Sequence, residues 1–252
     1  MPLSCDLRSL VRVIVITASL PLIASTVSAQ TYDPLVAGRG MAWGSLGFQG
    51  DLGGAVSSSG IGVVNGLRAE INGNTWAERY DAALIFSFGG AYNLTPRSQV
   101  FGTMTWEQSE ADTTEIGLIG GLPLDGKFSD YQGWGIDVGY RYLFVTEYRA
   151  TPFVSGSLGF QRLQDITLGL SSTPFTMSEI PFYDDSLVMG WRVGTGFLYD
   201  LNDRVGLQLT IDLKYAGVLS DQAGIGTVGF ERINDVGNRW TLPVLVGAYF
   251  KF

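Results

Sequence analysis

This sequence contains no histidine, and only 16% of its residues are charged. Without histidine there are no Ser–His or Cys–His nucleophile pairs, no histidine general bases and no histidine metal ligands. The formal net charge is −8, and no cluster of Lys and Arg stands out. Nucleic acid is not an expected partner, because phosphate contacts need clustered basic side chains. We predict no catalytic residue, no cofactor and no metal site.

Cysteine is nearly absent too, since the single copy, Cys5, precedes an apolar stretch at residues 13–24. Arg8 and Arg12 make the start of the chain basic, and the small residues "VSA" at 27–29 provide a cleavage site. The apolar stretch is shorter than the roughly 20 residues that a membrane-spanning helix needs. We therefore predict a signal peptide over 1–29, export from the cytoplasm, and one mature domain over 30–252 that lacks cysteine.

Long apolar runs are also missing after the signal segment, so helices are not expected to cross a membrane. The mature chain instead alternates with a period of two residues, as strands with two different faces do. In 134–144, apolar side chains fill one face, and Asp137 and Arg141 lie on the other. The same alternation, in places weaker, predicts further strands at 40–50, 80–92, 97–107, 150–162, 187–199, 205–215 and 240–252.

The links between these strands alternate in length. Three are short, at 93–98, 146–150 and 201–204, and the links between them are long and rich in Gly, Ser, Asp and Glu. Short turns at one end and long loops at the other are typical of a transmembrane barrel. We predict an all-β fold, an eight-stranded antiparallel up-and-down transmembrane β-barrel. The adjacent Asp184 and Asp185 are expected to be solvated at a junction between loop and strand.

The first spanning strand has two candidates, because 61–71 also looks like half of a hairpin. Counting it as a spanning strand would give nine, whereas single-chain outer-membrane barrels normally have an even number. Either 40–50 spans and 61–71 extends a hairpin above the membrane, or 61–71 spans and 30–58 forms an arm or plug. The first arrangement is favoured.

Alternation alone does not say which face points outward, since a soluble lipocalin-like barrel turns its apolar face toward a ligand cavity. Aromatic residues at both ends of the predicted strands indicate two membrane interfaces. The polar face is sparse and its charges are mixed, which suits a narrow lumen. The predicted interface aromatics are Tyr80, Tyr92, Trp106, Trp134, Tyr199, Tyr215 and Trp240. The predicted polar residues of the interior are Asp137, Arg141, Arg192, Asp212 and Lys214.

The last predicted strand keeps its alternation to the final residue, through Val244, Val246, Ala248, Phe250 and Phe252. Together with the alternating strands from "WGSLGF" (43–48) onward, it resembles the small eight-stranded outer-membrane barrels of the opacity-protein and porin-like surface-antigen family. It is also similar to the transmembrane domain of outer-membrane protein A.

This resemblance implies a location in the cell outer membrane, contact with its lipid and lipopolysaccharide, and recognition of the last strand by the barrel assembly machinery. It implies a non-enzymatic protein that presents surface loops, and it names no extracellular partner. The alternative is a porin-like channel. It would have to be narrow, because the interior of an eight-stranded barrel is only about wide enough for its own side chains. Pro243 cannot donate a ladder hydrogen bond, so we expect it near the outer rim, where pairing with the preceding strand is already giving out.

Overall fold

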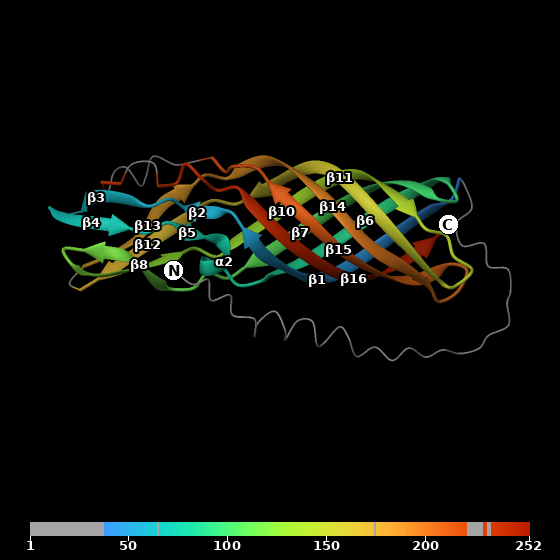
Figure 1. Cartoon of the computed structure of the whole chain (residues 1–252), viewed down its shortest axis with the longest axis horizontal. Helices are drawn as coiled ribbons and strands as arrows, with labels where there is room; N and C mark the ends of the chain where they lie inside the picture. The colour runs from blue at the N-terminus through green and yellow to red at the C-terminus, as the bar shows by residue number, and fades with distance from the viewer. Residues whose placement is uncertain (1–37, 65, 174, 221–228, 231–232) are drawn as a thin grey trace. The chain divides into compact units, whose positions relative to one another are not determined.

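A computed structural model describes residues 38–64, 66–173, 175–220, 229–230 and 233–252. The predicted signal peptide and Cys5 lie outside these residues. Eight strands form a closed antiparallel barrel in the order β1-β16-β15-β14-β11-β10-β7-β6, so each strand pairs with the neighbours expected of an up-and-down barrel (Figure 1). The predicted fold is confirmed. The barrel strands are β1 (Gly40–Gly53), β6 (Ala83–Thr95), β7 (Ser98–Ser109), β10 (Tyr131–Leu143), β11 (Ala150–Leu163), β14 (Ser186–Asp200), β15 (Val205–Ala216) and β16 (Arg239–Lys251).

The outer wall of this barrel is apolar and its interior is polar. Along β10, Ile136 and Val138 point outward and are 50% and 68% exposed, whereas Arg141 is buried inside. A soluble lipocalin-like barrel would have the opposite arrangement. Each barrel strand has 12 to 15 residues, more than the roughly 9–11 that cross a bilayer. The chain is therefore a membrane β-barrel. No helix among the described residues is long and apolar enough to span a membrane.

The barrel closes where β1 pairs with β16, from Met41 opposite Lys251 to Gly53 opposite Trp240. The predicted segment 40–50 is thus a barrel strand. The competing segment 61–71 forms the hairpin of β3 (Gly60–Val64) and β4 (Leu67–Ile71), which belongs to a different sheet. The choice between the two candidates is settled in favour of 40–50.

Pro243 lies where the pairing of β16 with β15 lapses, as expected, but this pairing resumes beyond it instead of ending there. It is opposite Gln49 on the β1 side. On the β15 side, the register passes from the Ile211–Val244 pair to Lys214–Thr241 with no paired positions between them. Pairing then continues toward the start of β16. Because proline lacks an N–H, the ladder is interrupted locally at Pro243 rather than terminated there.

The described parts of the four long links fold above one end of the barrel into a structure that we call the cap, and we call the opposite end the turn end. The cap contains an antiparallel sheet in the order β13-β12-β9-β8-β4-β3 and a small pair formed by β2 and β5 (Figure 1). Apart from the hairpin at 61–71, the sequence had suggested only loops here. The remaining elements of the cap are β2 (Ala55–Ser57), β5 (Asn74–Thr75), α2 (Trp76–Arg79), β8 (Thr114–Ile119), β9 (Leu122–Phe128), β12 (Ile166–Ser172) and β13 (Phe175–Tyr183).

The cap has a hydrophobic core of its own. Trp76 is completely buried and packs on Tyr80 and Tyr131, with ring centroids 5.3 Å and 6.0 Å away. Phe128 packs edge-on against Phe182 at 5.1 Å. These rings come from three different links and from the start of a barrel strand. Their burial provides the free energy that orders segments which would otherwise be flexible loops.

Candidate functional site: the barrel interior and the cap above it

The structure places all five predicted interior residues on the inner face of the barrel. Arg192 lies between two carboxylates, with Nη2 3.0 Å from Asp137 Oδ2 and Nη1 3.4 Å from Asp212 Oδ2. Lys214 does not join this group, because its Nζ is 3.0 Å from Glu107 Oε2. The predicted residues thus divide between two charge clusters, with Arg141 in a third environment.

Glu107 is the centre of the cluster nearer the cap, and its side chain is almost completely buried. Oε2 accepts hydrogen bonds from Gln49 Nε2 and Lys214 Nζ, both at 3.0 Å. Oε1 accepts from Gln161 Nε2 at 2.7 Å and from Arg239 Nη1 at 3.0 Å. Four donors from four different strands therefore meet on one carboxylate. Removing any one of these partners would leave a buried polar group unpaired, which is costly in a low-dielectric interior.

Arg239 connects this cluster to the cap. Besides Glu107, its guanidinium forms a two-pronged ion pair with Asp51, in which Nη2 is 3.0 Å from Oδ2. The same guanidinium lies over the rings of Trp76 and Tyr131, at 5.1 Å and 4.7 Å from their centroids. Cation–π contacts are strongest where water is excluded, as it is around these buried groups. Arg239 thus belongs to the lumen and to the cap core at once.

Arg141 occupies an aromatic cage nearer the turn end. Its guanidinium carbon is 4.2 Å from the ring centroid of Phe153 and 5.3 Å from those of Trp43 and Phe101. Its Nη1 is 3.5 Å from Gln99 Oε1. The large rings and the arginine together fill the cross-section of the barrel here, as expected for eight strands.

The positive and negative charges inside the barrel are equal in number. At the turn end, Lys251 pairs with Asp200, which also accepts a hydrogen bond from Tyr249. The five acidic members of the interior are Asp51, Glu107, Asp137, Asp200 and Asp212. The five basic members are Arg141, Arg192, Lys214, Arg239 and Lys251. A lumen without net charge does not favour ions of either sign.

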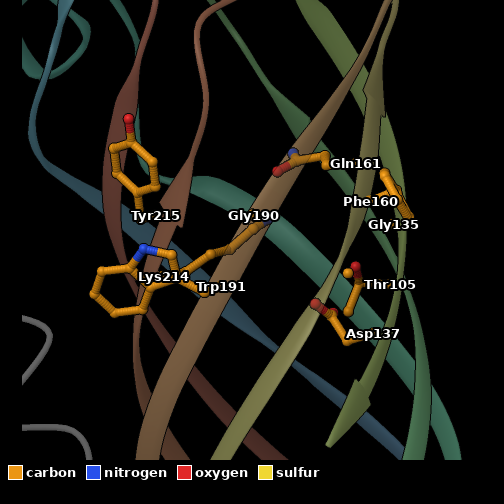
Figure 2. Close-up of a pocket in the computed structure, with 10 residues that line it drawn as sticks. Thr105, Gly135, Asp137, Phe160, Gln161, Gly190, Trp191, Lys214 and Tyr215 are labelled. Carbon is orange, nitrogen blue, oxygen red and sulfur yellow. The ribbon is translucent and has the colours of Figure 1, made fainter.

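Two small cavities are lined by residues of the barrel interior. Figure 2 shows Asp137 beside Thr105, with Gln161 nearby, around a cavity of about 10 Å³. A second cavity, of about 30 Å³, lies between Arg141 and Arg192. A single water needs roughly 10–15 Å³ of such volume, so the first cavity has room for at most one water and the second for about two.

Six of the seven predicted interface aromatics lie on the outer wall. Trp240 packs on Trp191 and Tyr215, with centroids 5.3 Å and 4.9 Å away. The exception is Tyr80, which precedes β6 and is buried in the cap core, where burial raises the pKa of its phenol. The alternation of β6 does not reach back to this residue, so its assignment to the outer wall was wrong. The outward-facing residues are Tyr92, Trp106, Trp134, Tyr199, Tyr215 and Trp240.

The five residues of the last strand proposed as an assembly signal all point outward. Val246, Phe250 and Phe252 are well exposed on the outer wall. Their recognition by an assembly machinery stays a prediction, because the placement shows only that their side chains are accessible from outside the barrel.

Sequence reasoning missed half of the charged interior. Glu107 stands at an inward position of β7, continuing the polar series of Gln99, Thr103 and Thr105. That alternation was the signal that could have identified it. Arg239 directly precedes Trp240 at the start of the last strand, where the sequence pattern does not indicate whether a side chain points into or out of the barrel. Among the residues that the structure describes, no group of three or more acidic or cysteine side chains could hold a metal ion.

Solved structures of outer-membrane barrels are similar in fold. Neisserial surface protein A has a TM-score of 0.49 at 12% identity, covering 84% of this chain and 97% of its own. OprG from Pseudomonas aeruginosa has a TM-score of 0.49 at 14% identity, with 87% and 98% covered. The outer-membrane protease OmpT from Escherichia coli has a TM-score of 0.39 at 11% identity, with 88% and 100% covered. No family model and no curated protein matches the sequence.

Proposed function

We propose that this protein is a non-enzymatic barrel of the cell outer membrane that holds the folded cap at the cell surface as a contact surface. The observation that carries the proposal is that the long links form a sheet with its own core, joined to the lumen through Arg239. A structure of this kind presents a fixed surface, whereas a diffusion pore requires an open path. The partners that we propose are outer-membrane lipid, lipopolysaccharide and the barrel assembly machinery; the extracellular partner is not identified.

The location of the cap can be tested by labelling. The hairpin between β8 and β9 turns at Gly120 and Gly121, whose φ angles of +56° and +83° favour glycine. We expect an epitope inserted between them to bind antibody on intact cells, because such exposed tips tolerate insertions. As a matched control, the same epitope in the 201–204 turn should be labelled only after lysis. Labelling in the reverse order would contradict the proposal.

A narrow channel is the alternative function, and conductance distinguishes the two. We expect the purified protein to insert into planar bilayers without steady current, because Glu107, Arg192 and Arg141 with their partners occupy successive levels of the lumen. A steady current that Arg192→Ala changes would favour the channel instead. Insertion is checked independently by the heat-modifiable migration of the folded protein on gels.

A further inference from the structure

The outer wall carries a groove of about 170 Å³ at the cap ends of β7, β10 and β11. It combines aromatic, amide and charged side chains. Its main lining residues are Trp106, Trp134, Gln132, Gln164, Arg162 and Asp185.

These residues stand where the wall changes from apolar to polar. In the strand register, Trp134 is directly opposite both Trp106 and Arg162. Two residues closer to the turn end, the corresponding row is wholly apolar; it consists of Met104, Ile136 and Phe160. Two residues closer to the cap, the row consists of amides, Gln108, Gln132 and Gln164. The groove therefore lies at the border between the lipid-facing wall and the polar cap end.

Arg162 and Asp185 form a paired but accessible polar group in the groove. Arg162 Nε donates to both carboxylate oxygens of Asp185, at 2.7 Å and 3.0 Å, and Nη2 also donates. The hydrogen bonds from Arg162 lower the pKa of Asp185, so the carboxylate is ionised at neutral pH. The two side chains remain 50% and 40% exposed, which leaves donors and acceptors for a ligand, and the pair has no net charge.

The indole of Trp134 offers an open face. Within the described part of the chain, no aromatic ring packs on Trp134, and it is 36% exposed. A second aromatic group on the outer wall consists of Trp191, Tyr215 and Trp240. Its rings, unlike that of Trp134, pack on one another, with centroid distances of 4.9 to 6.0 Å. An aromatic that serves only as an interface anchor needs no charged neighbours.

We propose that this groove binds the sugar headgroup of an outer-leaflet glycolipid, which rests on the proposed outer-membrane location. A sugar ring has a C–H face that packs on an indole, and its hydroxyls both donate and accept hydrogen bonds. The Arg162–Asp185 pair and the two amides provide the matching donors and acceptors. The apolar row below the groove would contact the acyl chains. A phosphate headgroup fits less well, because Asp185 already neutralises Arg162 and repels a further anion.

The test compares two lipids in phosphatidylcholine nanodiscs that hold the full-length folded protein. One lipid is a glucosyl diacylglycerol and the other is phosphatidylglycerol, and native mass spectrometry measures how much of each stays bound. We expect wild type to prefer the glycolipid. Trp134→Leu should weaken glycolipid binding roughly threefold to tenfold, the range of one aromatic contact, and Trp191→Leu should not. Asp185→Asn should shift the preference toward phosphatidylglycerol, because it leaves Arg162 unpaired.

The possible results separate the site from the proposed function. Unchanged glycolipid binding in inserted Trp134→Leu, an equal loss in Trp191→Leu, or a wild-type preference for phosphatidylglycerol would overturn the sugar site alone. A wild-type protein that does not insert into the bilayer would overturn the proposed function and the site together. Recovery of each protein together with the nanodisc lipids reports insertion, and heat-modifiable migration of every variant reports folding, so the two measurements tell these cases apart.

Discussion

Replacing Glu107 by glutamine is expected to destabilise the folded barrel by about 3–5 kcal/mol, the cost of removing one partner from a buried ion pair. The substitution keeps the shape of the side chain but removes its charge. Arg239 then keeps Asp51 as its paired carboxylate, whereas Lys214 loses its ion-pair partner, and one positive charge stays uncompensated in the interior. Unfolding in denaturant, followed by tryptophan fluorescence in detergent micelles, measures the change.

Two further variants make this measurement specific. Glu110→Gln removes the same charge three residues away at an exposed position, and we expect a change within about 0.5 kcal/mol. Adding Lys214→Met to Glu107→Gln restores the charge balance, so the double variant should be more stable than the single one. A Glu107→Gln protein as stable as wild type would show that the buried network does not stabilise the barrel.

Gly47→Ala is expected to prevent the barrel from closing between β1 and β16. A Cβ at Gly47 would lie 1.9 Å from the backbone carbonyl oxygen of Val244, and backbone cannot move aside as a flexible side chain can. Overpacking typically costs about 1–3 kcal/mol, and a clash with backbone at the closing pair should reach or exceed the upper end. The folded fraction is read from heat-modifiable migration after refolding into detergent micelles.

Gly50→Ala is the matched control for this prediction. Gly50 lies in the same strand, and a Cβ there would meet nothing within 4 Å. Both substitutions reduce the freedom of the unfolded chain equally, so the difference between them isolates the clash. Equal folded fractions for the two variants would contradict the assigned register of β1 and β16.

The barrel could be predicted from the sequence, and the cap could not. Each barrel strand has one face toward lipid and one toward a polar lumen. Apolar and polar residues therefore alternate along the strand with a period of two, as in 134–144. The cap strands meet a core assembled from several distant links, so the pairing of β4 with β8 or of β9 with β12 leaves no local pattern. For the same reason Tyr80 was assigned to the outer wall, although it follows α2 and packs inward.

The charged interior was predictable only where a strong strand pattern surrounded the residue. Asp137, Arg141 and Arg192 interrupt long apolar series, so their inward direction follows from their neighbours. Asp51 and Arg239 lie at strand ends where β1 and β16 close the barrel. Whether their side chains point inward depends there on the pairing with the neighbouring strand. The network around Glu107 joins residues more than 50 positions apart, a relation set by the order of strands in space.

The place of Arg239 in the chain also sets an order of events during assembly. It is the first residue of β16, one of the two strands that close the barrel, yet its guanidinium packs on two rings of the cap core. The cap therefore cannot reach its final packing until β16 has taken its place beside β1 and β15. Complete packing of the cap core thus depends on closure of the barrel.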